Sequence, residues 1–169
     1  MSGTDGRRQQ FRNAMAQLAA AVNIITTAGP AGRGGFTASA VCSVTDDPPT
    51  LLVCMHRSSA QHALFVANSV LCVNTLAAGH QNLSTVFAGV PAMSITERFG
   101  LTDWESLATG APVLPSALAS FDCRIVETVD KGTHSVFFAE VLAMKRNPER
   151  AHGLVYFSRR YHQVGLSTG

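Results

Sequence analysis

The spacing of apolar residues predicts a helix followed by a strand at the start of the chain. Phe11, Met15 and Leu18 recur at helical spacing, which predicts an amphipathic helix over residues 8–20. Residues 22–27 (VNIITT) are rich in β-branched side chains, which favour extended backbone and predict a strand. The chain therefore changes from one type of element to the other within a few residues.

Most of the remaining pattern is typical of strands. Glycines and a proline in residues 29–35 predict a chain reversal, and residues 36–44 alternate in a way that predicts one strand with two different faces. Residues 50–55 and 70–76 are continuous apolar runs and predict strands buried on both faces. Further strands are expected at residues 119–128, 135–144, 153–157 and 161–166.

Short helices are expected between some of these strands. Residues 59–67 have a helical pattern, with Ser58 or Ser59 in position to serve as the N-cap. A second helix is expected at residues 81–88, and residues 94–97 (SITE) have the form of a capping box that opens a third.

The order of the elements indicates the fold class. Strands follow one another at hairpin spacing without regular alternation of strand and helix, and no repeat is present. We therefore expect residues 1–169 to form one mostly β domain, with residues 1–7 as a flexible tail. The expected architecture is an antiparallel, Greek-key-like barrel with short flanking helices.

Composition limits the classes of partner. Only 14% of residues are charged, well below the usual quarter, so some apolar surface is expected to be hidden between the subunits of a homo-oligomer. The net charge of +2 comes from scattered residues, which argues against nucleic acid as a partner. The chain has no apolar run long enough to span a membrane and no signal peptide, and a cytoplasmic location is expected.

The cysteines and histidines give no sign of a metal site. The four cysteines lie inside apolar runs without CxxC spacing, and they are expected to be buried, reduced thiols. The six histidines include no pair four residues apart, so no metal is predicted.

Two segments have residues suited to ligand binding. Residues 56–59 (HRSS) offer an arginine and two hydroxyls beside a predicted helix start, which suits a phosphate group, although this feature alone favours a plain helix cap with a solvated arginine. Residues 36–39 (FTAS) carry small side chains that leave room for a flat ligand, or for close packing against a helix. A GxGxxG fingerprint is missing, so a Rossmann nucleotide site is not expected.

A set of motifs, in this order and over residues 11–164, resembles the flavin reductase family, whose fold is the FMN-binding split barrel. The resemblance implies a homodimer with one flavin per subunit near the interface. The motifs are residues 11–15 (FRNAM), 20–27 (AAVNIITT), 35–44 (GFTASAVCSV), 48–54 (PPTLLVC), 71–74 (LCVN), 87–89 (FAG), 97–99 (ERF), 120–123 (SFDC), 132–134 (GTH) and 153–157 (GLVYF).

The resemblance also implies roles for single residues. His134 is expected to lie on the nicotinamide side and to orient that ring, and no residue is expected to act as a general base. Tyr161 and His162 are expected to close over the nicotinamide side. Ser58 and Ser59 are expected to hold the flavin phosphate. The other expected flavin contacts are Thr37, Ala38 and Ser39 at the ring, Ser43 at the ribityl chain, Cys72 and Asn74 on the next strand, and Ser84, Phe87, Ala88 and Arg98 on the covering helices.

The implied function is that of an NAD(P)H-dependent flavin reductase. Hydride would pass from nicotinamide C4 to flavin N5, and the reduced FMN or FAD would diffuse to a separate monooxygenase. The choice between NADH and NADPH stays open, although Arg159 and Arg160 are suited to a 2′-phosphate. Alternatives are a flavin-dependent reductase of a cobalt corrinoid, a flavin-binding electron carrier without NADH turnover, and a barrel that binds no flavin.

Overall fold

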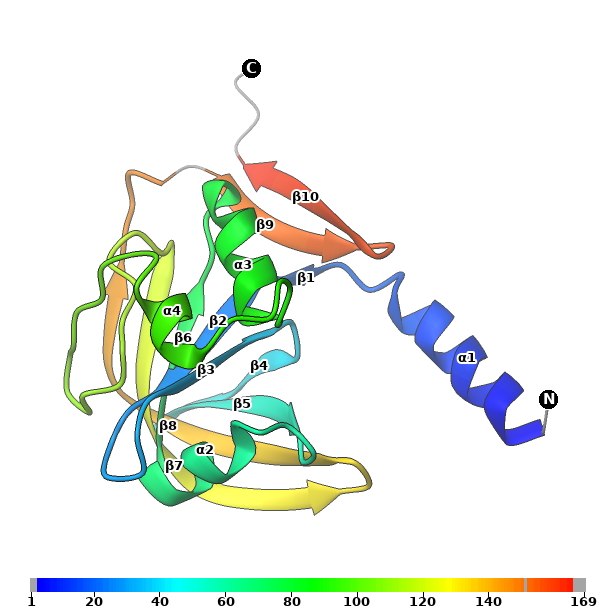
Figure 1. Ribbon diagram of the computed structural model, residues 1–169, viewed down its shortest axis with the longest axis horizontal. Coiled ribbons are helices and arrows are strands. Elements are labelled where there is room, and N and C mark those ends of the chain that lie inside the picture. The colour runs from blue at the N-terminus through cyan, green and yellow to red at the C-terminus, as the bar shows by residue number, and fades with distance from the viewer. Residues whose placement is uncertain (1–2, 151, 166–169) are drawn as a thin grey trace.

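Two antiparallel sheets form the frame of the molecule (Figure 1). The computed structural model describes residues 3–150 and 152–165. The larger sheet has the strand order β3-β2-β6-β7-β8-β5-β4, and the smaller sheet has the order β1-β9-β10. Strands of the larger sheet are β2 Asn23–Thr27, β3 Gly34–Ala38, β4 Val41–Asp46, β5 Pro49–His56, β6 Val70–Thr75, β7 Ala119–Lys131 and β8 His134–Arg146; those of the smaller sheet are β1 Ala20–Ala21, β9 His152–Phe157 and β10 Arg160–Gly165.

The two edges of the larger sheet are consecutive in the chain. β3 forms one edge and β4 the other, and only Ser39 and Ala40 connect them. The prediction of one strand over residues 36–44 was therefore wrong. Polar and apolar residues keep alternating through Ser39 and Ala40, so the pattern gives no sign that the chain leaves one edge there and enters the other.

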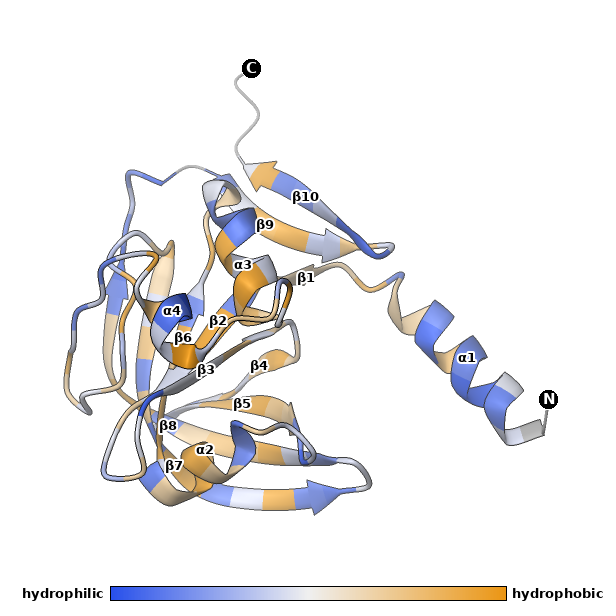
Figure 2. Ribbon diagram, in the orientation of Figure 1, coloured by the Kyte–Doolittle hydropathy of each residue, from blue (hydrophilic) through white to orange (hydrophobic). Residues whose placement is uncertain are grey.

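Two hydrophobic clusters lie on opposite faces of β2. Ile25 belongs to the cluster that includes Phe65 and Phe137, whereas Ile24 belongs to the cluster that includes Phe87 and Phe99. Neighbouring strand residues point to opposite faces, so β2 is buried on both. Figure 2 shows the corresponding apolar colour along β2, β4 and β5. The predicted run at β5 differs, because its residues alternate between buried and half-buried positions.

Helix α1, Gly3–Met15, stands away from the body of the molecule (Figure 1). It begins and ends five residues before the predicted span of 8–20. Because Ala20–Ala21 pair with β9 as strand β1, the residues before them must turn, and Ser158 N–H donates to Ala16 O there. Residues 3–7, expected in a flexible tail, are helical, while residues 1–2 lie outside the described part.

The other helices are short and cover the ends of the sheet. α2, His62–Asn68, has Gln61 as its N-cap without a side-chain cap, so the prediction of Ser58 or Ser59 as N-cap was wrong. α3, Gln81–Phe87, follows the 3₁₀ turn η1, Ala78–His80.

The predicted capping box is confirmed at α4, Ile95–Phe99. Ser94 N–H donates to Glu97 Oε2 at 2.7 Å, and Glu97 N–H donates to Ser94 Oγ at 3.2 Å. Each residue thereby satisfies one donor that a helix start leaves unpaired. Of the described helices, none is both long enough and apolar enough to cross a bilayer.

Candidate active site

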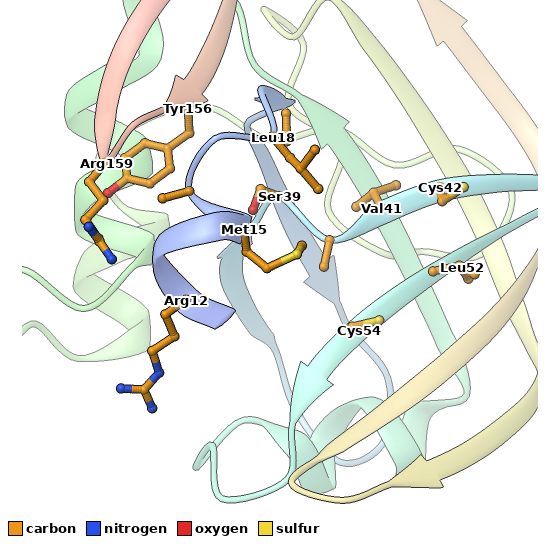
Figure 3. Close-up of a pocket in the computed structure, with 13 residues that line it drawn as sticks. Arg12, Met15, Leu18, Ser39, Val41, Cys42, Leu52, Cys54, Tyr156 and Arg159 are labelled. Atoms are coloured by element: carbon orange, nitrogen blue, oxygen red, sulfur yellow. The ribbon is translucent and has the colours of Figure 1, made fainter. Parts of the chain in front are cut away.

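A large cavity opens where the chain crosses between the two sheet edges (Figure 3). Its volume is about 750 Å³, within the range of small-molecule sites. β4 and β5 form one wall, α1 and the segment after it form a second, and the turn between β9 and β10 forms the third. The lining residues are Arg12, Met15, Ala16, Leu18, Ala20, Ser39, Ala40, Val41, Cys42, Leu52, Cys54, Tyr156 and Arg159.

A second cavity of about 350 Å³ adjoins the first. The two share Ser39, Tyr156 and Arg159, so they are neighbouring parts of one groove. The smaller part is otherwise lined by Val22, Thr37, Ala38, Thr85, Ala88 and Tyr161.

Hydrogen bonds fix the wall of the smaller cavity. Thr37 Oγ1 donates to the backbone oxygen of Ser84, and the Ser84 hydroxyl lies 3.0 Å from the Tyr161 hydroxyl. The ring of Tyr161 in turn meets Tyr156 edge to face, with centroids 5.3 Å apart. These contacts join β3, α3 and the small sheet, so the cavity is held in shape by three separate elements.

The groove has a basic rim and an otherwise uncharged surface. Arg12 and Arg159 supply the charge, and Arg159 Nη2 donates to Asn13 Oδ1 at 2.6 Å. Arg159 and Ser158 have φ values of 60° and 50° in the turn between β9 and β10, an uncommon backbone for residues other than glycine. Of the described residues lining the two cavities, none is Asp, Glu or His. Such a surface suits a flat, anionic ligand.

The backbone beside the groove is also available for ligand contacts. β3 and β4 are edge strands, so each has one side that is not paired within the sheet. Edge N–H and C=O groups are ready partners for the polar rim of a ring. Ala38, Ser39 and Ala40 have small side chains here. Their backbone oxygens already accept hydrogen bonds, from Asn23 Nδ2, Val41 N–H and Cys54 N–H respectively, so a ligand would have to share these acceptors or use N–H groups.

Five of the predicted site residues lie on the groove, and two lie behind its wall. Thr37, Ala38, Ser39, Ala88 and Tyr161 line it. Behind them, Ser84 is fully buried and holds Tyr161, while Phe87 is buried against Phe99 and Trp104. Gly35 allows that packing, because a Cβ there would lie 2.8 Å from the Phe87 ring.

Ser43 and Arg98 line neither of these two cavities. Ser43 lines a third cavity of about 280 Å³, together with Phe121 and Met144, and this cavity shares Val41 and Cys42 with the one of about 750 Å³. Arg98 donates from Nε to Met93 O at 3.1 Å, within the segment that leads into α4.

Cys72 and Asn74 are sealed inside the molecule, fully buried on β6. Asn74 Oδ1 accepts from Leu114 N–H at 2.8 Å and from the Ser120 hydroxyl at 3.0 Å, and its Nδ2 donates to Ile24 O at 3.2 Å. These bonds anchor the segment before β7, and neither Cys72 nor Asn74 lines either cavity.

Ser58, Ser59 and His134 meet near the end of β5. His134 pairs with His56 across β5 and β8, and the two rings lie edge to face with centroids 4.8 Å apart. Ser58 approaches His56 Nδ1 with its N–H at 3.1 Å and its hydroxyl at 2.8 Å. The structure therefore groups His134 with the predicted phosphate residues. His162, expected beside it, instead packs against Phe157 with ring centroids 5.9 Å apart.

Sequence reasoning missed several residues that line the groove. Arg12 and Met15 reach it from α1, and Tyr156 reaches it from β9. No local pattern brings these elements together, because the contact depends on β1 pairing with β9. Cys42 and Cys54 were missed because they were expected to be buried, whereas Cys42 is exposed and Cys54 half-buried.

The two remaining cysteines are buried as predicted, and all four thiols are free. Burial raises the pKa of the Cys123 thiol to about 12, with a smaller contribution from the nearby Asp122 carboxylate. The pKa of the Cys72 thiol is raised even further by the same causes. Burial also raises the pKa of the Cys54 thiol. Within the described residues, no group of three or more His, Cys, Asp or Glu is arranged to hold a metal ion.

Comparison with known proteins identifies the family. A family profile described as "Flavin reductase like domain" matches residues 15–165. The chain belongs to the flavin reductase family. It is accordingly an oxidoreductase, and its mostly β fold is the split barrel of flavin reductases.

Relatives of this flavin reductase are found among both sequences and structures. The chain is 60% identical to the FMN reductase (NADH) RutF of Ancylobacter novellus over 93% of this chain and 85% of that protein. It is 29% identical to BorF, the flavin reductase component of a bacterial two-component tryptophan halogenase, with a TM-score of 0.86 over 94% of this chain and 99% of that one. It is also 29% identical to the styrene monooxygenase flavin reductase of Pseudomonas putida S12, with a TM-score of 0.81 over 93% of this chain and 98% of that one.

Proposed function

We propose that this flavin reductase reduces FMN with NADH. The observation that carries the proposal is the two-part groove with a basic rim, built where the edge strands β3 and β4 meet. It has room and charge for a flat ring that carries an anionic tail. Relatives named FMN reductase (NADH), one of them 60% identical, support the choice of flavin and nucleotide.

The flavin is placed along the larger cavity. Its ring lies over Ser39, against the backbone of β3 and β4, and its tail runs along β5 from Cys54 toward Ser58. Ser58 and Ser59 then hold the phosphate through loop donors, without a helix N-terminus. His134 in this arrangement stands beside the phosphate rather than beside the nicotinamide, because its ring contacts His56.

The nicotinamide is placed in the smaller cavity, beside Tyr156 and Tyr161. Flavin supplies N5 as the acceptor of a hydride from nicotinamide C4. The groove residues bind and orient the two rings and exclude water from between them. An acid or base is not required of the chain for this step, which agrees with the uncharged lining between the two arginines.

We further propose that the reduced flavin leaves for a separate oxygenase. The two structural relatives described above are named as parts of two-component or monooxygenase systems, which supports a diffusible product. An open groove at a sheet edge also suits release better than a closed cavity would.

A second copy of this chain is the proposed partner. Phe11 and Leu18 are 66% and 63% exposed, and the beginning of α1 stands away from the body of its own chain. Val126, Leu142 and Met144 expose further apolar surface on β7 and β8. Apolar surface of this extent is typical of a subunit interface.

The activity is tested with purified protein, NADH and FMN. Loss of the near-ultraviolet absorbance of NADH is expected to depend on added flavin and to be slower with NADPH. Flavin-independent oxidation of NADH, or none at all, would contradict the proposed function.

The homodimer is tested by light scattering after gel filtration. Phe11→Glu places a charge in the proposed interface and is expected to shift the protein toward monomer. Gln10→Glu, a charge at an exposed polar position of the same helix, is the matched control and is expected to leave the dimer intact. A wild-type protein that is monomeric would contradict the homodimer.

A further inference from the structure

The turn between β9 and β10 carries an arginine in a backbone conformation that favours glycine. Phe157 pairs with Arg160, so the hairpin loop consists of Ser158 and Arg159 alone, with φ values of 50° and 60°. A two-residue loop with positive φ at both positions is most often Asn-Gly, because a Cβ in this region crowds the backbone. Residues held in such a conformation are concentrated at functional sites. The backbone of this turn therefore gives no reason for an arginine, and the side chain of Arg159 has to supply one.

The Arg159 guanidinium lies at the groove with most of its donors available. Arg159 lines both cavities, as do Ser39 and Tyr156. Its Nη2 donates to Asn13 Oδ1 at 2.6 Å, which uses one of the several N–H donors of a guanidinium. Arg12, the residue before Asn13, lines the larger cavity. Among the described residues, neither arginine is paired with a carboxylate, so this rim keeps its positive charge.

The two arginines lie across the larger cavity from the wall that is proposed for the flavin. Cys42 and Leu52 come from β4 and β5, whereas the arginines come from α1 and the β9–β10 turn. Figure 3 shows Arg12 and Arg159 on the same side as Tyr156, away from Cys42 and Leu52. The flavin tail is placed along β5, so the anion that meets these arginines belongs to the other ligand. A nicotinamide in the smaller cavity continues through its ribose into a pyrophosphate, and Arg159 stands where the two cavities join.

We propose that Arg159 binds the pyrophosphate of NADH, assisted by Arg12, and so sets the affinity for the hydride donor without affecting that for flavin. This inference rests on the proposed function. A guanidinium can donate two parallel N–H bonds to two phosphate oxygens, which makes the contact both strong and directional. The pyrophosphate is remote from the reacting atoms, so the contact is the same before and during hydride transfer. An interaction of this kind lowers KM and leaves kcat unchanged.

The experiment compares two hydride donors in steady-state kinetics of the full chain with FMN. The donors are NADH and N-benzyldihydronicotinamide, which carries no phosphate. Arg159→Gly removes the guanidinium and places in the turn the residue that a φ of 60° favours, so the urea midpoint is expected to be no lower than that of the wild type. Its KM for NADH is expected to rise at least about tenfold, with kcat and the KM for the phosphate-free donor changed less than about twofold.

Three further variants separate direct binding from other effects. Asn13→Ala removes the acceptor that joins Arg159 to α1 but keeps the guanidinium, so the KM for NADH is expected to stay within about twofold of the wild type. Arg7→Gln removes one positive charge from an exposed position of α1 that lines neither cavity, and it is expected to have as little effect. Arg12→Gln is expected to raise the KM for NADH by a smaller factor than Arg159→Gly does, because Arg12 lines only the larger cavity.

The possible results are distinguishable. An unchanged KM for NADH in Arg159→Gly would overturn the inference and leave the proposed function standing. An equal rise for both donors would also overturn it, as would a rise that Asn13→Ala reproduces, because Arg159 would then act only by holding α1. Weaker binding of FMN but not of riboflavin, with NADH unaffected, would assign the arginine to the flavin phosphate instead. A wild-type protein that does not oxidise NADH in the presence of FMN would overturn the proposed function as well.

Discussion

Two sets of small and polar residues were expected to contact flavin, but one set lies at an open sheet edge and the other is buried in the interior of the sheet. Thr37, Ala38 and Ser39 lie at a sheet edge and line an open groove. Cys72 and Asn74 lie in the middle of the same sheet, fully buried under the segment before β7. A polar residue on a central strand satisfies backbone that has no other partner, whereas one on an edge strand leaves backbone free for a ligand.

Thiol labelling gives the largest expected contrast between these regions. Cys42 and Cys54 line the groove, so they are expected to react with a thiol reagent in the folded protein and to be protected by FMN. Cys72 and Cys123 are expected to react at least about a thousandfold more slowly than the two groove cysteines. Burial raises the pKa of both thiols, and a reagent reaches them only when the protein opens. Mass spectrometry of labelled peptides measures each site. Fast labelling of Cys72 would mean that the interior region is open.

Asn74→Ala is expected to have the next largest effect. It leaves Leu114 N–H and the Ser120 hydroxyl without their acceptor inside the core, which is expected to lower the free energy of unfolding by about 3 kcal/mol. Urea denaturation measures this loss. FMN affinity of the folded fraction is expected to be unchanged, and a loss of affinity at unaltered stability would place Asn74 at the ligand after all.

Ser39→Phe is expected to show the reverse behaviour. A large ring at this exposed position fills the junction of the two cavities, so FMN affinity is expected to fall at least about tenfold, which is about 1.4 kcal/mol. The free energy of unfolding is expected to change by less than about 0.5 kcal/mol, as is usual at surface positions. Ser39→Ala is the control that removes only the hydroxyl. Unchanged affinity in Ser39→Phe would move the flavin out of this groove.

The features predicted correctly from the sequence are those that depend on residues close together in the chain. The capping box at Ser94 and the strand at residues 22–27 depend on neighbouring residues, and both are present. The boundaries of α1 were missed because they depend on β1 pairing with β9 far along the chain.

The candidate site was harder to predict because it depends on where the sheet ends. The alternation in residues 36–44 continues across the change of edge, so periodicity alone gives one strand instead of two. Four successive residues of β6 are buried, so no polar face distinguishes Cys72 and Asn74 from a ligand-binding strand. The resemblance to a family supplied candidates for contact, and the topology separated those on the groove from those in the core.

The length of the two-residue link between β3 and β4 is expected to affect the size of the groove more than the strand pairing that stabilises the barrel. Ser39 and Ala40 belong to neither strand, and Cys54 N–H of β5 donates to Ala40 O at 3.1 Å. An insertion before Ala40 would keep that bond, so it is expected to widen the binding site without shifting the register of β4 against β5. A protein built this way can change the bulk of its ligand by insertion at one point. Grafting longer links here is thus a direct route to variants that take larger flavins.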